Sequence, residues 1–252
     1  MLKKVMPITA IAMALMAAPA MAQNTGHVGL AYSNNDDAEI DAWAVEGATT
    51  FAFSDAIGAQ VDGSLGTIDG DGDSATAYDI NGHLFYNGGA WRVGALFGAA
   101  DVDTGGINPS ATHWGVEGVY WLERVALGGS AIWGDGEGIL VPDFEYNNYD
   151  FNADFYATEN FVIGATLGVG SLDSGTSEVD TTSYGVNAEW QLSSMPVSLL
   201  AGYTHWELDD VPVESEAFSI GARWNWGGTL VERDRAGFRN TASSVVGRYF
   251  GN

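Results

Sequence analysis

Hydrophobic and polar positions alternate along most of the chain, and residues 183–206 show the pattern most clearly. Every second position of the first half is apolar: Tyr184, Val186, Ala188, Trp190 and Leu192. After a turn at residues 193–196, the alternation resumes with Val197, Leu199, Ala201 and Tyr203. A period of two is typical of a β-strand with one apolar face. We therefore expect a β-hairpin that is apolar on one side and small or polar on the other.

The same period predicts about twelve strands of roughly ten residues each. They are expected near residues 27–33, 42–53, 57–67, 77–86, 91–100, 112–122, 125–133, 148–156, 161–171, 183–192, 197–206 and 217–226. Acidic, glycine-rich segments recur about every 35 residues and are separated by short turns, so long and short connections should alternate. The fold class that accounts for this pattern is all-β, an antiparallel transmembrane β-barrel of about twelve strands, within a range of about 10–14.

A soluble β-sandwich is the main alternative, since its strands also alternate. Strands of roughly ten residues are long for a globular sheet, where about 5–6 is usual. Aromatic residues also gather at the strand ends, as they do at the two interfaces of a membrane barrel. Strand parity then predicts sets of lipid-facing residues, such as Trp91, Val93, Ala95 and Phe97; Trp114, Val116, Tyr120 and Leu122; Tyr149, Phe151 and Phe155; and Phe218, Ile220, Trp224 and Trp226.

Both ends of the chain differ from the expected barrel, which spans residues 23–226. Residues 1–22 have the features of a secretory signal peptide, with Lys3 and Lys4, an apolar run at residues 5–18 and the cleavage site Ala20-Met21-Ala22. The run is shorter than the roughly 20 residues of a membrane-spanning helix, although a retained anchor remains the alternative. Residues 227–252 form a basic tail that is expected in the periplasm, in the lumen as a plug, or as a final strand.

Charge excludes several classes of function. The chain has 9 Lys+Arg against 33 Asp+Glu, a net charge of −24, and no cysteine. Disulfides and thiolate metal sites are therefore excluded, and so acidic a chain is not expected to bind nucleic acid through its phosphates. The acidic residues gather in the expected long connections, while the arginines lie at the opposite end of the strands or in the tail. Solubility is the plainest explanation of acidic loops, and attraction of cations is the second.

Positions of the opposite parity would line the lumen. Eight charged members of this set are our candidate pore-lining residues: Glu46, Asp62, Asp79, Arg92, Glu117, Asp154, Glu189 and Arg223. Rings of carboxylates favour cations, and carboxylates that face arginines set a transverse field across a pore. The alternative is a closed barrel in which the same residues form an internal network of ion pairs.

The signal peptide, the aromatic-rich alternating hairpins, the short turns and the acidic loops together resemble a small porin-like outer-membrane β-barrel of a Gram-negative bacterium. The resemblance covers most of the mature chain and is architectural. It implies export through a cleaved signal peptide, an outer-membrane location, and passive diffusion of small, preferentially cationic or neutral solutes. The implied partners are outer-membrane lipids and lipopolysaccharide. The alternative is a closed structural or binding barrel whose acidic outer loops meet divalent ions, lipopolysaccharide or a surface partner.

Two features depart from that family. General trimeric porins fold a long third loop into the pore, whereas the third loop expected in this chain, residues 101–111, is short. Many such barrels end on an aromatic residue of the final strand, whereas Trp226 closes the last expected strand and a tail follows.

Catalytic chemistry finds little support in the sequence. Only four histidines exist, and no G-x-S-x-G motif frames a serine, so no enzyme is expected. His113 and His205 each precede a tryptophan, and we expect both in the interfacial girdle, with His205 facing lipid.

One acidic motif suggests a metal. Asp69, Asp71 and Asp73 resemble the start of a calcium loop, but Ile80 stands where an EF-hand needs a glutamate. We therefore expect no cofactor beyond loosely bound calcium at this motif.

Overall fold

The computed structural model describes residues 24–35, 40–70, 73–106, 108–138, 143–209 and 213–239. The expected signal peptide and residues 240–252, which include Arg248, lie outside this range. The described strands are β1 (Thr25–Asn35), β2 (Ile40–Ala52), β3 (Ile57–Gly70), β4 (Asp73–Asn87), β5 (Trp91–Asp103), β6 (Ser110–Trp121), β7 (Val125–Glu137), β8 (Phe144–Thr158), β9 (Phe161–Asp173), β10 (Glu178–Gln191), β11 (Val197–Leu208) and β12 (Val213–Trp226). Helix α2 (Leu230–Ala236) follows the last strand.

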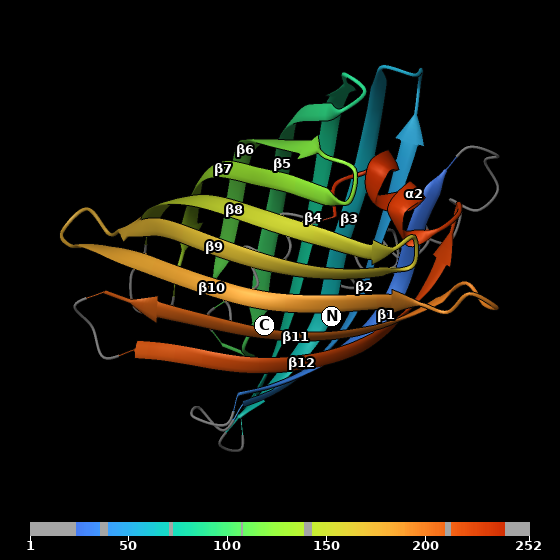
Figure 1. The fold of residues 1–252 in the computed structure, drawn as a ribbon. Coiled ribbons are helices and arrows are strands. Elements are labelled where there is room, and N and C mark those ends of the chain that lie inside the picture. Colours follow the sequence, from blue (N-terminus) through green and yellow to red (C-terminus); the bar gives the residue numbers. More distant parts are fainter. Residues whose placement is uncertain are drawn as a thin grey trace.

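The strands form one closed antiparallel barrel (Figure 1). Each strand pairs with its neighbours in sequence, and β1 closes the ring against β12 with Gly26 opposite Trp226 and Asn34 opposite Phe218. Closure leaves no unpaired sheet edge, which a membrane requires of a β structure. The predicted fold class of about twelve antiparallel strands in a barrel is confirmed.

The predicted alternation of long and short connections is wrong. Only residues 71–72 separate β3 from β4, as few as residues 159–160, which separate β8 from β9 at the opposite end. The strands run further into the acidic segments than expected, so that Asp173 of β9 pairs with Glu178 of β10. Acidic residues have low strand propensity, but a backbone ladder that is already paired can continue through them. Many of the expected loop carboxylates therefore lie on strand ends.

The outer surface of the barrel carries the apolar side chains that parity placed there. Trp91, Val93 and Phe97 are exposed on β5, and Phe218, Ile220 and Trp224 are exposed on β12. His113 departs from the expectation. It faces the lumen, where its Nε2 lies 2.8 Å from Asn81 Oδ1, because it has the opposite parity to its neighbour Trp114.

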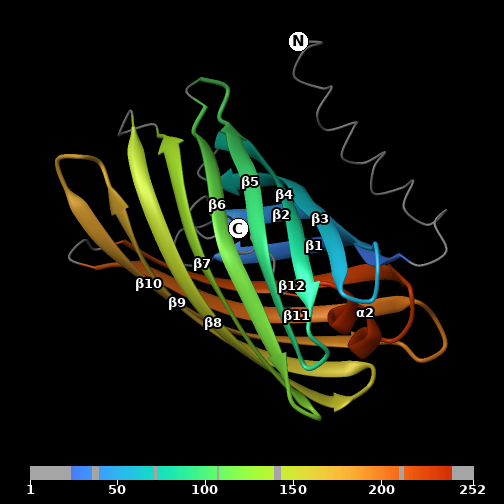
Figure 2. The ribbon, with the colours of Figure 1, turned by 90° about the horizontal axis from the view of Figure 1, so that it is seen from above.

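The core lies inside the barrel. One apolar cluster of Leu96, Ala111, Ile132 and Tyr146 fills the wall of β5 to β8. A second cluster joins Ala126, Tyr156 and Val162 of the wall to Leu230 of α2. Figures 1 and 2 show α2 within the ring of strands, at the end where the β8–β9 turn lies. No described helix is long and apolar enough to cross a membrane.

Candidate functional site

Residues 229–239, called here the C-terminal segment, turn back from the end of β12 into the lumen (Figure 2). The reversal depends on Gly227 and Gly228, whose φ angles of 91° and 118° lie in the region that favours glycine. A Cβ on Gly227 would also lie 2.6 Å from Thr25 Cγ2, so β1 leaves no space for a side chain there. The Gln191 side chain donates a hydrogen bond of 3.1 Å to the Gly228 carbonyl. Local backbone geometry therefore directs the chain inward.

Helix α2 is short and is stabilised at its start by a capping box. Thr229 Oγ1 accepts from the Glu232 backbone N–H, and the Glu232 carboxylate accepts from the Thr229 backbone N–H. The Thr229 N–H and the Thr229 hydroxyl both donate to the Glu232 carboxylate, and these two bonds lower the pKa of Glu232. The helix presents Leu230 to the wall, where it is fully buried. The segment is thus held by apolar packing as well as by its charges.

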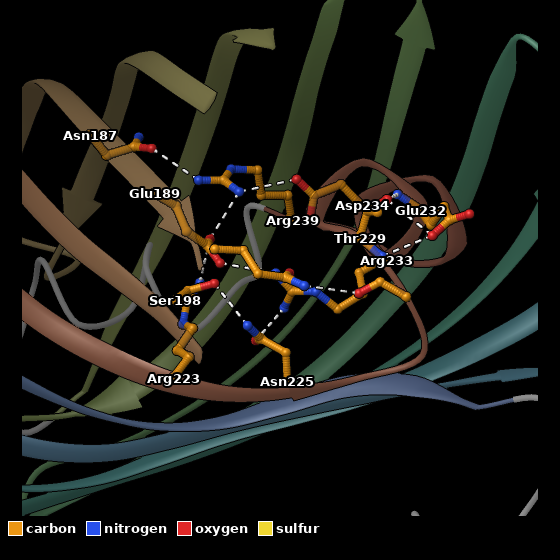
Figure 3. A network of polar contacts seen from close by, with 12 residues as sticks. Asn187, Glu189, Ser198, Arg223, Asn225, Thr229, Glu232, Arg233, Asp234 and Arg239 are labelled. Carbon is orange, nitrogen blue, oxygen red and sulfur yellow. Dashed lines mark hydrogen bonds and ion pairs between the residues drawn. The ribbon is translucent and has the colours of Figure 1, made fainter. Parts of the chain in front are cut away.

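One buried carboxylate collects three guanidinium groups (Figure 3). Glu189 of β10 is 1% exposed. Its Oε1 accepts from Arg233 of α2 at 2.9 Å, and its Oε2 accepts from Arg239 at 3.1 Å and from Arg223 of β12 at 3.2 Å. Arg223 also forms a bidentate pair with Glu46 of β2. We call Glu189 with Arg223, Arg233 and Arg239 the Glu189 cluster.

Arg239 extends this cluster to two further carboxylates. Its Nη1 donates to Asp234 at 3.0 Å, and its Nε lies 3.6 Å from Asp154 of β8. Burial lowers the pKa of the Arg239 guanidinium, but Asp234, Glu189 and Asp154 outweigh it and hold that pKa above its ordinary value. Arg239 therefore stays charged while it is docked.

Arg92 of β5 holds the backbone of the segment. Its two terminal nitrogens donate to the carbonyls of Gly237 and Arg235. The guanidinium also lies over the rings of Phe85, Trp121 and Phe238, at 4.6, 4.9 and 5.3 Å from their centroids. Such stacking stabilises a desolvated guanidinium. Arg92 therefore acts on the segment as a hydrogen-bond donor and as a stacking partner.

The side-chain amide of Gln60 holds Phe238 in place as well. The Phe238 N–H donates to Gln60 Oε1 at 2.8 Å, and Gln60 Nε2 donates back to the Phe238 carbonyl at 3.1 Å. The phenyl ring meets Phe85 edge-on, with centroids 5.5 Å apart. The Gln60 side chain of β3 therefore satisfies both the N–H and the carbonyl of Phe238.

A second charged group lies entirely within the wall. His83 of β4 sits between Asp62 of β3, at 2.7 Å from Nε2, and Glu117 of β6, at 2.6 Å from Nδ1. All three side chains are buried. We call them the His83 cluster. An imidazole held between two carboxylates at these distances neutralises charge inside the barrel.

The remaining space in the lumen is uneven. A cavity of about 330 Å³ is lined by Ser33, Ala42, Ala44, Asn187, Gly202 and Ser219, and by the charged groups of Glu46, Arg223 and Arg239. Along residues 233–239 of the C-terminal segment, two cavities measure only about 50 and about 30 Å³, and a third of about 220 Å³ lies between Ala236 and the β2–β3 turn. The two small cavities hold water and little else, since a single water molecule needs about 10–15 Å³ of such space.

The sequence-derived pore candidates fall into separate groups in the structure. Glu46, Glu189 and Arg223 meet in or beside the Glu189 cluster, and Asp62 and Glu117 meet in the His83 cluster. The remaining three have different partners: Asp79 with Ser64 and Asn81, Arg92 with the segment's backbone, and Asp154 with Arg239.

Two contributors were missed at the level of sequence, His83 and Phe238. His83 has the same parity as Asp79 and Asn81 on β4, so strand parity contained that signal. Phe238 lies in a segment without strand periodicity, and no sequence pattern pointed to it.

The proposed calcium motif is only partly described. Asp69 lies on β3 and is paired with Ser74, and Asp73 begins β4 opposite Gly70. Asp71 lies outside the described residues, so calcium binding at this motif stays a prediction.

No protein-family model matches the chain, and no curated protein matches it. Among solved structures, the chain is similar to the KdgM porin in complex with disordered oligogalacturonate, with a TM-score of 0.56 and 7% identity over 79% of this chain and 99% of that chain. It is also similar to the translocator domain of the autotransporter NalP from Neisseria meningitidis, with a TM-score of 0.55 and 10% identity over 89% of this chain and 98% of that chain. The likeness shows the fold of outer-membrane β-barrels.

Proposed function

We propose that the protein is a porin-like outer-membrane channel that is closed by its own C-terminal segment. The segment closes the lumen at the end where the β8–β9 turn lies, called here the inner mouth. The observation that carries this proposal is the narrowing of the lumen, from a cavity of about 330 Å³ to cavities of about 50 and about 30 Å³ beside the segment. Small solutes enter the wider part of the lumen, and they cross the barrel only after residues 229–239 leave the lumen. The segment docks at one end of the barrel, so its release requires no change in the strands.

The charges of the wall support a preference for small cationic or neutral solutes. Lumen-facing carboxylates outnumber the lumen-facing arginines of the strands, which are Arg92 and Arg223. When the segment leaves, Glu189 loses Arg233 and Arg239, and Asp154 loses Arg239. The open lumen then carries uncompensated negative charge, which attracts cations.

A permanently closed barrel is the second candidate, and the pairing of the lumen charges favours it. Three guanidinium groups share Glu189, and two carboxylates share His83. In this alternative the networks stabilise the barrel, and function lies in its outer surface, which would bind ions, lipopolysaccharide or another surface. We propose no catalysis in either case.

Conductance in planar lipid bilayers distinguishes the two candidates. The Arg233→Gln/Arg239→Gln variant removes both guanidinium groups that the segment gives to Glu189 and leaves the wall unchanged. We expect discrete current steps with a cation-selective reversal potential under a KCl gradient, where the unaltered protein is mostly silent. The matched control is Arg235→Gln, which changes an exposed arginine of the same helix and should behave as the unaltered protein.

Current from the control equal to that of the double variant would contradict closure by the Glu189 cluster. Silence from all three proteins, each shown to be folded and inserted, would support the closed barrel.

A further inference from the structure

His205 is buried on the outer surface of the barrel. It lies on β11 near the end opposite α2, on the same face as the exposed Leu199. Parity predicts an exposed, lipid-facing ring, yet only 7% of the residue is accessible. The ring stacks on Tyr184 of β10, with centroids 4.7 Å apart and planes 20° apart. His205 therefore lies on the predicted outer face, but the neighbouring strands cover its ring.

Two carboxylates flank the buried ring. Nε2 lies 3.5 Å from Glu207 Oε2, and Nδ1 lies 3.4 Å from Glu216 Oε1. Within the described residues, Nδ1 makes no hydrogen bond although it is inaccessible to water. A buried polar nitrogen without a hydrogen bond is uncommon in a folded protein. The ring thus lies between two carboxylates, and its Nδ1 has no hydrogen bond to either.

A third carboxylate completes the group. Glu214 of β12 stands directly opposite Glu207 in the ladder, and Glu216 stands opposite His205. Like charges placed opposite each other destabilise a sheet. No described arginine forms an ion pair with these three glutamates. One donor atom each from His205, Glu207 and Glu214 lie within 4.8 Å of one another. A cation at this point would relieve the repulsion.

The geometry points to the kind of cation. Donors that sit about 2.1 Å from a tetrahedral zinc ion are about 3.4 Å apart. The separation of 3.5 Å between His205 Nε2 and Glu207 Oε2 is close to this value, and it is long for a hydrogen bond. An imidazole nitrogen together with carboxylate oxygens suits zinc and its neighbours among the transition metals, whereas calcium prefers oxygen ligands alone.

We propose that His205, Glu207 and Glu214 bind a divalent transition-metal ion of the zinc type on the outer face of the barrel. Nε2 of His205 is the nitrogen ligand, and each glutamate gives one oxygen. Glu216 lies beside the other ring nitrogen, in the position of the carboxylate that orients a metal-binding histidine. Three protein ligands leave a fourth position for water. The site is independent of the lumen and of the proposed channel.

Titration of refolded, tag-free protein with Zn²⁺ in a calorimeter tests the site. We expect one saturable site in the unaltered protein that excess Ca²⁺ does not displace. His205→Gln should weaken binding about 100-fold or more, since it removes a direct ligand. Glu214→Gln should weaken it at least about tenfold, and it leaves the ring stacked on Tyr184. Glu178→Gln is the matched control, because it neutralises an exposed strand-end carboxylate that has no histidine beside it.

Two results would overturn the proposal. One is the absence of saturable Zn²⁺ binding by unaltered protein that shows heat-dependent gel mobility. The other is unchanged affinity in Glu214→Gln, which decides the question even if His205→Gln fails to fold.

Discussion

The Glu189 cluster and the His83 cluster are both buried charge inside one barrel, and they differ in what they join. The His83 cluster links β3, β4 and β6 and makes no ion pair with the C-terminal segment among the described residues. The Glu189 cluster links β10 and β12 to two arginines of the segment. Ion pairs within the wall form whenever the barrel closes, whereas pairs with the segment form only when it docks. Buried charge therefore joins wall strands to one another in the His83 cluster, and it joins the wall to the C-terminal segment in the Glu189 cluster.

Glu189→Gln should have the largest effect on docking. Removing one partner of a buried ion pair costs about 3–5 kcal/mol, because the other charge is left uncompensated. If cleavage requires release of the segment, tryptic cleavage at Arg233, Arg235 and Arg239 should accelerate about 100-fold or more. Mass spectrometry of the C-terminal fragments measures the rate.

Glu117→Gln is the control for this comparison. It makes the same substitution at a buried carboxylate of the His83 cluster and should leave the cleavage rate of the segment nearly unchanged. Equal acceleration by both substitutions would mean that the two clusters act as one unit.

Leu230→Ala should have the next largest effect on docking. Truncation of a buried leucine typically costs about 2–5 kcal/mol, so cleavage of the segment should accelerate about 30-fold or more. Leu96→Ala makes the same truncation in the apolar cluster of the wall. It should lower the urea midpoint of the barrel and leave cleavage of the segment slow. A fast cleavage in Leu96→Ala would show that the segment is released only by unfolding of the wall.

Acid should weaken the helix cap by the smallest amount. The pKa of Glu232 is lower in the docked helix than in the unfolded chain because Thr229 donates to its carboxylate. The cap therefore stabilises fully above the unfolded pKa, and this contribution is lost as the pH falls through the lower, folded pKa. The loss of this contribution should raise the rate of proteolytic cleavage of the segment less than tenfold between neutral pH and about pH 3, with each rate measured at its own pH. Glu232→Gln retains the cap without the titration, so its pH dependence should be weaker; identical profiles would contradict this role.

The fold could be predicted because alternation repeats on every strand. One parity contains the exposed Phe97 and Ile220, and the other contains the buried Asp62 and Glu189. The strand ends could not be predicted, since residues such as Asp173 and Glu178 look like loop residues until a neighbouring ladder extends through them.

The partners of the charged residues were harder to predict than the faces they occupy. His83 meets Asp62 and Glu117 across strands, and the pairing depends on the stagger of the barrel. His205 lies on the predicted face, but its burial could not be predicted because it comes from Tyr184 on another strand. Complementary charge between the tail and the lumen suggested a plug as one of three alternatives. The contacts that the C-terminal segment makes with the wall depend on the turn at Gly227 and on the packing of Leu230.

A reversible cross-link between the segment and the wall tests the central claim most directly. A Cβ on Gly237 would lie 2.3 Å from Thr50 Oγ1, which places it near Thr50 Cβ within the range of about 3.5–4.5 Å that disulfides need. It would also lie 2.3 Å from Gln60 Oε1, so the end of the Gln60 side chain has to shift. Gly237 has an extended backbone, and the chain has no other cysteine. Thr50→Cys and Gly237→Cys therefore form a unique pair, to be combined with Arg233→Gln/Arg239→Gln.

We predict that the oxidised protein is silent in the planar bilayer and that a reductant added to the same membrane restores discrete cation-selective steps. Gly237→Cys alone, in the same background, should conduct with or without the reductant. Equal current from the oxidised and reduced double-cysteine protein, with the disulfide verified by mass spectrometry, would contradict the account that the C-terminal segment closes the channel.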